Sequence, residues 1–341
     1  MKITYDYCTS EMKEDLISFI NEHWQKDHIL TKSKVLCDWQ YKNEDGGYNF
    51  VLALDTEHNI MGILGFIPVA HFSRDLAVHK EYWLSIWKVR EDCPSPGIGV
   101  GMLKFFNKTR VPQTICSLGL SQMVKPIYQV MNYQQGILKH FVAFNTRLKS
   151  FKFVSPPKAI VLKEVKSDEY LSHLDESDLM SFDEETTQQL YSCFPRKDST
   201  YLINRYLNHP IYQYQILGIS NRCSEIVSVI VVRIIEVNGT NIARVIDVFG
   251  SLPFVKNLSQ LLVDWINEND VEYIDLMIHT QQLTHVTDSH FIEVTNDITI
   301  PNFFEPLEMV NHQIDYAFKT KYHEVFNIFK GDSDQDRPAQ L

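Results

Sequence analysis

The stretch EYWLSIWKVREDCPSPGIGVG, residues 81–101, decides which fold this chain is expected to have. Apolar and polar residues alternate over 81–90, a pattern that predicts a strand. A Pro94-Ser95-Pro96 loop follows, and Gly97-Ile98-Gly99-Val100-Gly101 then opens a segment with helical spacing that extends to residue 109. Free backbone amides at a helix N-terminus, with glycines that permit close approach, suit a phosphate group. A Gly-rich turn that only packs a helix against a sheet would show the same pattern.

Two other phosphate motifs are excluded. A dinucleotide fingerprint needs GxGxxG after the first strand and an acidic residue about 20 positions further on. Here GIGVG follows the third predicted strand, and no acidic residue stands at a strand end near position 120. A P-loop needs Gly-Lys-Ser/Thr, which the sequence lacks.

The spacing of apolar residues predicts an α/β layer over the first part of the chain. The predicted helices cover 13–25, 97–109 and 124–133, and the predicted strands cover 48–54, 60–71, 81–90, 114–120 and 136–144. This order of elements makes some of the strands parallel.

The second half repeats this order. Ser155-Pro156-Pro157-Lys158 interrupts the regular pattern, so we expect one domain at 1–150 and another at 151–341. An acidic stretch at 168–185 is expected to be a solvated helix or loop, and the polar tail at 331–338 an irregular segment. The predicted strands cover 212–219, 225–237, 241–249 and 273–278, and the predicted helix covers 255–267.

The charge of the chain limits its ligands. There are 43 acidic and 32 basic residues, which gives a net charge of −11. Nucleic acid needs a basic face, so we do not expect it as a partner. Any anionic ligand must be held locally, by backbone amides or by a few placed cations.

Other features predict a cytoplasmic protein. The sequence after Met1 has no secretion signal, and the apolar stretches are too short to cross a bilayer. The 6 cysteines show no metal-ligand spacing, which predicts reduced thiols and no bound metal.

A second motif, SQMVKPIYQVMNY at 121–133, follows the strand predicted at 114–120. Together the two segments resemble the GNAT superfamily of acyl-CoA-dependent N-acyltransferases. In that superfamily an Arg/Gln-x-x-Gly-x-Gly turn binds the coenzyme A pyrophosphate, and a later helix carries Tyr-x-x-x-Gly-Phe. Gly97, Gly99 and Tyr128 match these motifs. Pro94 replaces the Arg or Gln, and Asn132-Tyr133 stands in for Gly-Phe, since Asn tolerates the left-handed conformation.

The resemblance is good over residues 1–145, and over the remainder it rests on the order of the predicted elements. It implies two tandem GNAT-like domains, each a mixed, partly parallel sheet flanked by helices. The second domain is expected to be degenerate, because Asp247-Val248-Phe249-Gly250-Ser251-Leu252-Pro253 replaces the glycine turn.

The resemblance also implies an acyl-CoA thioester as co-substrate. The strand at 81–90 should separate from its parallel neighbour near Trp87 and Val89, where free backbone groups would pair with pantetheine. The Val89 amide would stabilise the oxyanion, and Tyr128 would protonate the departing thiolate. A core aromatic on an amphipathic helix is the alternative for Tyr128. The implied coenzyme-binding residues are Trp87, Val89, Ser95, Pro96, Gly97, Ile98, Gly99, Val100 and Ser121.

The attacking amine must also lose a proton. His71 is the expected base, because its ordinary pKa lies near neutrality, and Glu81 is the alternative. Direct attack needs no enzyme nucleophile, so Cys93 and Cys116 are expected to be structural.

The acceptor substrate is expected to contact a loop between the first helix and the first strand. Lys32 or His28 would bind a phosphate there, and Trp39 or Tyr41 would stack on a ring, although Trp39 suits a core position equally well. Asp247, in the second half, would bind an ammonium or cap a strand pair. The expected acceptor-binding residues are His28, Lys32, Trp39, Tyr41, His71 and Asp247.

Tandem GNAT proteins of this layout resemble enzymes that acylate dTDP-linked amino-dideoxy sugars for surface polysaccharides, with acetyl or 3-hydroxybutanoyl thioesters. Trp39-Gln40-Tyr41 and the segment 334–338 carry this closer similarity. It implies small-molecule substrates, no membrane insertion, and a monomer or homodimer. An aminoacyl-tRNA-dependent peptidyltransferase and a non-catalytic acyl-CoA-binding module are the alternatives.

Overall fold

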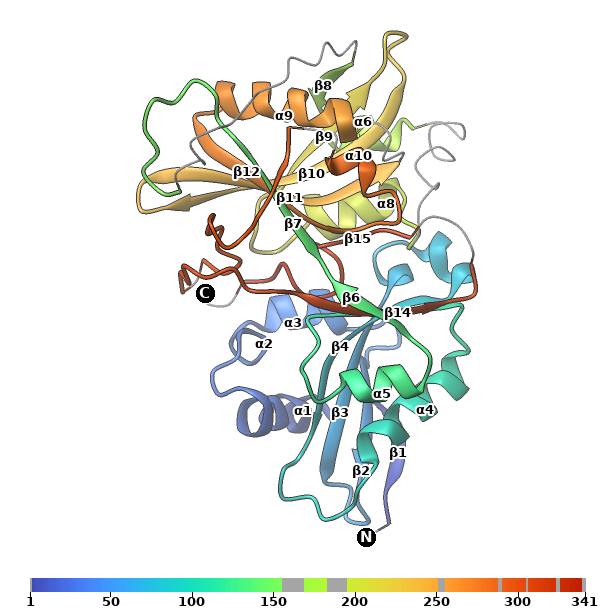
Figure 1. The fold of residues 1–341 in the computed structure, drawn as a ribbon. Coiled ribbons are helices and arrows are strands. Elements are labelled where there is room, and N and C mark those ends of the chain that lie inside the picture. Colours follow the sequence, from blue (N-terminus) through green and yellow to red (C-terminus); the bar gives the residue numbers. More distant parts are fainter. Residues whose placement is uncertain are drawn as a thin grey trace.

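The computed structural model describes residues 2–154, 169–182, 195–250, 255–287, 290–304, 306–322 and 326–338. They form two mixed β-sheets flanked by helices, one above the other in the view of Figure 1. This arrangement confirms the expected α/β class with two similar layers.

The first sheet has seven strands among the described residues, in the order β1-β2-β3-β4-β5-β14-β6. β4 and β5 are parallel, and the other neighbours are antiparallel. The strands are β1 Thr4–Cys8, β2 Tyr48–Leu54, β3 Ile60–Pro68, β4 Glu81–Val89, β5 Thr114–Leu118, β6 Gln134–Ile137 and β14 Asp315–Thr320. The helices and helical turns are α1 Lys13–Phe19, η1 Ile20–Trp24, α2 Ile29–Lys32, α3 Lys34–Tyr41, η2 Val69–His71, η3 Arg74–His79, α4 Ile98–Arg110 and α5 Lys125–Val130.

The second sheet has eight described strands, in the order β13-β7-β12-β11-β10-β9-β8, with β15 paired to β12. β11 and β12 are its parallel pair. The strands are β7 Lys139–Phe144, β8 Tyr170–His173, β9 Gln215–Ser220, β10 Ile226–Val237, β11 Thr240–Gly250, β12 Val271–His279, β13 Ile292–Glu293 and β15 Ile328–Phe329. The helices and helical turns are α6 Glu176–Met180, α8 Ser199–Leu202, η4 Ile203–Leu207, α9 Val255–Glu268 and α10 Thr284–Thr287.

Helices cover both faces of the first sheet, because its central strands are apolar on both sides. Val51 and Ala53 of β2 belong to the core under α4, whereas Phe50 and Leu52 belong to the core under α1 and α3. The second of these cores continues into the second half of the chain and includes Tyr206. The two halves therefore share one apolar interior.

Most strands of the two central hairpins and parallel pairs were predicted from the sequence. β2, β4, β5, β9, β10, β11 and β12 lie where alternation or apolar runs predict them. The acidic stretch contains β8 and α6 within its described residues, so its strand was missed. The predicted strand at 60–71 ends at Pro68, after which η2 turns the chain.

One predicted strand is divided between the sheets. Residues 136–144 were expected to complete the first layer, but β6 ends at Ile137 and β7 begins at Lys139. β6 pairs with β14, and β7 pairs with β12 of the second sheet (Figure 1). Hydrogen-bonded pairing thus passes from one sheet to the other at Leu138, whereas the boundary at residue 150 remains a prediction. Local alternation cannot show which sheet a strand joins.

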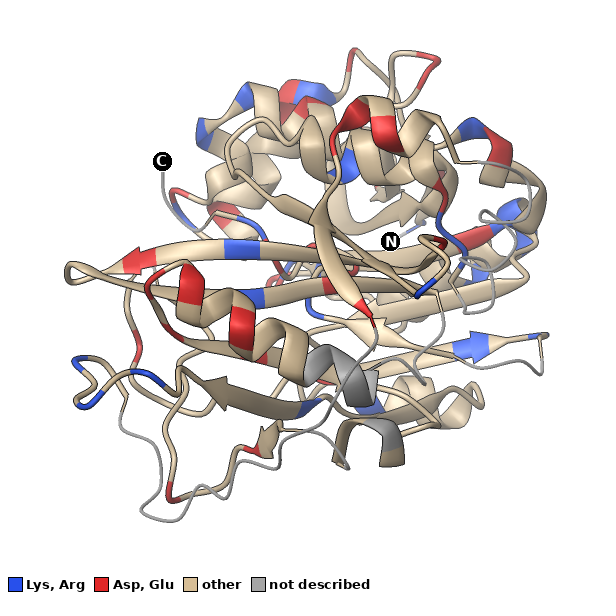
Figure 2. Cartoon of the chain, turned by 90° about the horizontal axis from the view of Figure 1, so that it is seen from above, with Lys and Arg blue, Asp and Glu red and all other residues tan. Residues whose placement is uncertain are grey.

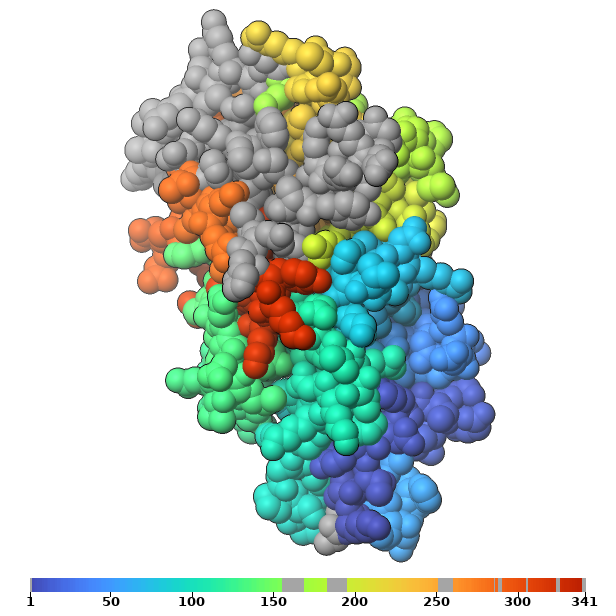
Figure 3. Space-filling view, turned by 90° about the vertical axis from the view of Figure 1, so that its right-hand side faces the viewer, coloured from blue at the N-terminus to red at the C-terminus, as the bar shows by residue number. Residues whose placement is uncertain are grey.

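The tail at 331–338 is irregular, as its polar composition predicts, but it is buried. Arg205 donates to the carbonyl oxygens of Gly331 at 3.0 Å and Ser333 at 2.6 Å. Lys197 lies 2.8 Å from the fully buried Asp332 carboxylate. In the view of Figure 3, the red residues at the end of β14, which precede the tail in the chain, lie against the first half. The tail therefore packs between the two halves.

Surface charge is mixed in the view of Figure 2, where acidic and basic residues are interspersed over helices and strand ends. None of the described helices is long and apolar enough to cross a membrane.

We expect Lys197→Met to unfold the protein more readily, because it leaves Asp247 and Asp332 buried without their shared cation. The loss should be about 3–5 kcal/mol in free energy of unfolding, measured by denaturant titration. Lys139→Met is the matched control, since Lys139 pairs with Glu293 where both are half-exposed, and it should cost at most about 1 kcal/mol. Equal losses in the two variants would contradict the role of Lys197.

Candidate functional site

β4 and β5 separate at the C-terminal end of β4. Their parallel pairing runs from Glu81 opposite Thr114 to Leu84 opposite Ser117, the last pair in the described part of the chain. β4 continues to Val89. The separation expected near Trp87 and Val89 is therefore present, and it leaves the β5-facing edge of β4 available to a ligand.

β4 also contains a bulge where the separation begins. Leu64 of β3 faces Trp87 and Phe66 faces Leu84, so Ser85 and Ile86 together oppose Gly65. A side chain at Gly65 would meet Ser85 Oγ at 2.5 Å, which explains the glycine. Tyr41 donates a 2.9 Å hydrogen bond to Ser85 Oγ. The bulge thus has fixed geometry and turns backbone groups out of the regular ladder.

The glycine turn begins helix α4. Gly97 has φ +81° and precedes Ile98, the first residue of the helix. Gly99 faces the strand, because a Cβ there would lie 3.1 Å from Trp87 Nε1. Arg90 and Lys88, the nearby cations, already pair with Asp92 and Glu91. The amides of the first helical turn are therefore the groups left to bind an anion here.

Tyr128, at the middle of α5, lies across the separation of the strands. Its ring meets the Trp87 ring of β4 edge-on at 5.8 Å, and the Ser117 side chain of β5 hydrogen-bonds its phenol. Burial raises the pKa of Tyr128, against a small lowering by Ser117. The phenol is therefore protonated at neutral pH. Asn132 ends this segment with φ +58°, as expected from its place in the motif.

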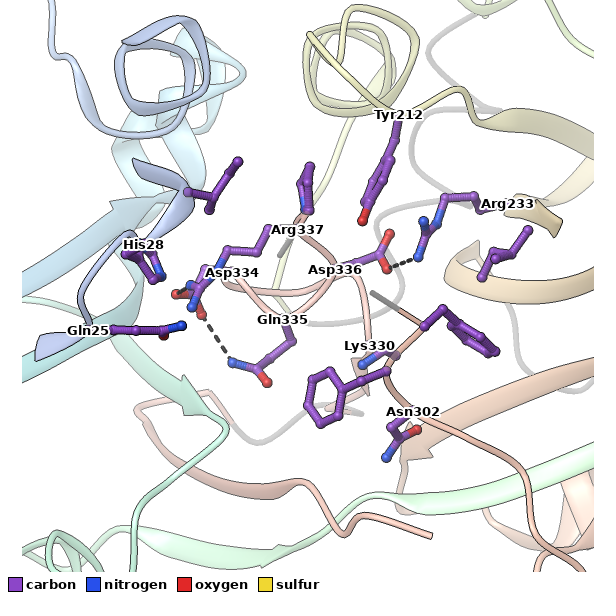
Figure 4. Close-up of a pocket in the computed structure, with 15 residues that line it drawn as sticks. Gln25, His28, Tyr212, Arg233, Asn302, Lys330, Asp334, Gln335, Asp336 and Arg337 are labelled. Carbon is purple, nitrogen blue, oxygen red and sulfur yellow. Dashed lines mark hydrogen bonds and ion pairs between the residues drawn. The ribbon is translucent and has the colours of Figure 1, made fainter. Parts of the chain in front are cut away.

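A cavity of about 220 Å³ lies on the other side of the buried tail (Figure 4). Its lining comes from both halves and from the tail, and includes His28, Arg233, Lys330, Asp334 and Arg337. The remaining lining residues are Gln25, Ile29, Tyr212, Ile235, Asn302, Phe303, Phe304, Gln335, Asp336 and Pro338.

The tail connects this cavity to the separated strands. Ser333 donates to the Leu84 carbonyl at 3.2 Å, and Gln335 donates to the Leu118 carbonyl at 3.3 Å. Gln335 also lines the cavity. The tail therefore contacts the separated strands through Ser333 and Gln335 and lines the cavity through Gln335.

The segment expected to be an acceptor-binding loop is helical, and its side chains lie in different surroundings. Of the side chains expected to bind the acceptor there, His28 lines the cavity; its Nδ1 accepts from Leu30 N at 3.3 Å, and burial lowers its pKa to about 4. Lys32 pairs with Asp27 on the surface. Trp39 donates to the Asn204 carbonyl at 3.2 Å, in contact with the second half.

The remaining predicted acceptor and base residues lie outside the cavity. Tyr41 is fully buried beside Ser85, as described above. His71 makes a 2.7 Å hydrogen bond from Nε2 to the Trp39 carbonyl, and its Nδ1 lies 3.5 Å from Asn49 Nδ2. Burial lowers the pKa of His71. Both ring nitrogens are therefore occupied at the end of β3, far along β4 from Val89.

Two buried carboxylates, Asp247 and Glu81, have protein partners in the second half of the chain. Asp247 does bind an ammonium, but it is that of Lys197, at 2.6 Å and 2.7 Å. Tyr206 also donates to Asp247, so no acceptor capacity remains for a substrate. Glu81 faces Arg196 at 3.5 Å, and burial raises its pKa to about 7. Neither pairing could be predicted from local sequence patterns, because the partners are distant along the chain.

The structure adds residues that sequence reasoning missed. Ser85 and Ile86 form the bulge, and the tail supplies Ser333 and Gln335 between strands and cavity. Lys330 supplies an unpaired cation. Among the described residues, no group of His, Cys, Asp or Glu side chains could hold a metal ion. Ser95, Pro96, Val100 and Ser121 remain predictions.

Comparison with known proteins identifies the fold. No protein-family model and no curated protein match the sequence. A GCN5-related N-acetyltransferase from Anabaena variabilis ATCC 29413 is similar in structure, with 11% identity, 93% of this chain and 72% of that chain covered, and a TM-score of 0.57. The chain has a tandem GNAT fold.

A second solved structure is also similar in fold. It is a conserved protein of unknown function from Enterococcus faecalis V583, described as a probable N-acyltransferase. It is 8% identical, with 92% of this chain and 72% of that chain covered, and a TM-score of 0.52.

The second GNAT layer has the same separation of parallel strands, but protein fills it. β11 and β12 pair as far as Val245 opposite Leu276. β15 pairs with the end of β12, and Gly331 N donates to the Ile246 carbonyl of β11 at 2.8 Å. Residues 251–253 of the expected turn lie outside the described residues. In the described part of the second layer, protein groups thus occupy the separation, while its degeneracy remains a prediction.

Gly99→Val should weaken binding of coenzyme A at least about tenfold, because the branched side chain would displace Trp87 and shift the start of α4. Gly99→Ala should have a smaller effect, since only its methyl group presses on the indole. Titration calorimetry measures the affinity, and the thermal midpoint of each sample shows whether it is folded. Wild-type affinity in a folded Gly99→Val protein would show that this turn does not hold the coenzyme.

Proposed function

We propose that this chain is an acyl-CoA-dependent N-acyltransferase. One observation carries the proposal: Tyr128 spans the gap between β4 and β5, and the gap opens toward the glycine-rich start of α4. The proposed phosphate site, the open edge of β4 and the protonated Tyr128 thus lie in the same order as the diphosphate, the pantetheine and the thioester sulfur of acyl-coenzyme A. The neighbours of similar fold, an N-acetyltransferase and a probable N-acyltransferase, support it.

In this proposal, the first turn of α4 binds the coenzyme diphosphate through its amides. Pantetheine then lies along the open edge of β4 beside Trp87 and Val89. Three or four strand residues, or about 10–13 Å, separate Val89 from the bulge at Ser85 and Ile86. The thioester would therefore reach the bulge, and we assign the oxyanion to its amides in place of the Val89 amide expected from the sequence.

The reaction follows from these positions. The amine nitrogen attacks the thioester carbonyl carbon, and the carbonyl oxygen takes the negative charge at the bulge. The carbon–sulfur bond then breaks, and the sulfur takes the Tyr128 proton as it leaves. The amine loses its own proton to water, because both nitrogens of His71 are already engaged.

We propose the cavity behind the tail as the acceptor site. Ser333, next to the cavity-lining Asp334, donates to the Leu84 carbonyl beside the bulge, and His28 is the expected acceptor residue that lines the cavity. A dTDP-linked amino sugar is the acceptor proposed from the sequence resemblance. About 220 Å³ is below the range of roughly 300–1,000 Å³ for sites that enclose drug-sized ligands, so the sugar would enter while the nucleotide stays outside.

The amino-sugar proposal and its alternatives differ in ligand binding. Coenzyme A and dTDP should each raise the thermal midpoint, by about 2–4 °C at 100 times Kd. Stabilisation by coenzyme A alone would exclude the dTDP-sugar acceptor and keep the acyltransferase. Stabilisation by neither would contradict both. A mass-spectrometric screen of dTDP- and UDP-amino sugars against several acyl-CoA thioesters would then identify products and separate an enzyme from a binding module.

Tyr128→Phe should lower turnover about 10²–10⁴-fold and leave coenzyme A affinity nearly unchanged, because it removes only the proton donor. Steady-state kinetics and calorimetry measure the two quantities. Tyr133→Phe is the control, since the Tyr133 ring packs at 4.8 Å from Tyr128 and is also buried. Full turnover in Tyr128→Phe would exclude the acid role.

A further inference from the structure

Lys330 is a buried cation without a hydrogen-bonding partner. Its side chain is 2% exposed, and Nζ makes no hydrogen bond to the described residues. It lines the cavity of Figure 4, where the Phe303 ring lies 5.3 Å from Nζ. Buried lysines are normally paired, because removing an ammonium from water is costly. Such a group at a cavity wall indicates a ligand.

The other charged groups around the cavity already have partners. Arg233 binds Asp336 at 2.8 Å, and Tyr214 donates to the same carboxylate. Arg337 binds Asp334. These carboxylates therefore bind other groups, and neither forms a hydrogen bond with Lys330.

Asn302 is a second unpaired group in the same wall. Its Nδ2 donates to the His312 carbonyl, but its buried Oδ1 has no hydrogen-bond partner among the described residues. The cavity therefore offers an unpaired donor and an unpaired acceptor.

We propose that Lys330 binds a carboxylate on the acceptor substrate, an inference that rests on the proposed function. One carboxylate would pair the ammonium and leave the existing ion pairs intact. A phosphate dianion fits less well, because the carboxylates of Asp334 and Asp336 line the same cavity.

Binding of a carboxylate by Lys330 would fix the orientation of the acceptor substrate. The carboxylate lies at Lys330, and the amine reaches toward Ser333 and the bulge of β4. An amino acid or an amino-uronic acid meets both requirements, whereas a neutral amino-dideoxy sugar leaves Lys330 unpaired. The inference thus favours a smaller, acidic acceptor over the dTDP-linked one.

Carboxylate binding should depend on pH. Burial and the guanidinium groups of Arg244 and Arg233 lower the pKa of Lys330 to about 7, while the carboxylates of Asp336 and Asp275 oppose this. A bound carboxylate favours the ammonium form, so binding takes up a proton. Affinity should therefore fall as pH rises above 7, by roughly tenfold per pH unit.

Sodium acetate is the simplest probe, with sodium chloride at equal concentration and acetamide as controls. At pH 6 acetate should raise the thermal midpoint of the full chain by about 1–2 °C over both controls. Lys330→Met should lose this shift, and Lys104→Met, an exposed lysine on α4, should keep it. The wild-type shift should disappear at pH 9, a test that needs no variant.

The inference fails if acetate acts like chloride at pH 6, if Lys330→Met keeps the shift, or if the shift persists at pH 9. Stabilisation by coenzyme A is measured on the same samples. A chain stabilised by coenzyme A but not by acetate would retain the proposed function and lose the carboxylate site. A chain stabilised by acetate alone would lose the acyltransferase proposal.

Discussion

The buried ammonium of Lys197, held between Asp247 and Asp332, is the interaction on which this architecture depends. Although burial opposes it, these carboxylates raise the pKa of Lys197 and keep it charged. Asp247 belongs to β11, Asp332 to the tail, and Lys197 to the segment before α8. The ion pairs therefore fix the tail between the halves, and the tail in turn forms the boundary between the separated strands and the cavity.

A separated pair of parallel strands occurs in both sheets, but the gap is filled in one sheet and bordered in the other. In both sheets a parallel pair of strands separates after a few residues. In the second sheet β15 and Gly331 occupy the gap, whereas in the first the tail hydrogen-bonds to Leu84 and Leu118. One continuous segment thus fills one gap and borders the other, so the same stretch of chain distinguishes the two layers.

Sequence patterns predicted those features that depend on residues close together in the chain. The strand at 81–90, the glycine turn at α4 and the left-handed Asn132 follow from side-chain alternation and backbone preferences. The proposed acceptor site could not be predicted in this way. Asp336 belongs to a segment that looks like a solvated polar tail in sequence, but it is buried against Arg233, which lies far along the chain. The division of 136–144 between two sheets has the same non-local cause.

The position of β14 has a consequence for how the chain acquires its structure. Residues 315–320 lie between β5 and β6, so Thr114 pairs with Thr320 across most of the sequence. During synthesis on the ribosome one edge of β5 stays uncovered until residues 315–320 have emerged, about 200 residues after β5 itself. Such long-range closure is slow, and the waiting edge invites pairing with other nascent chains.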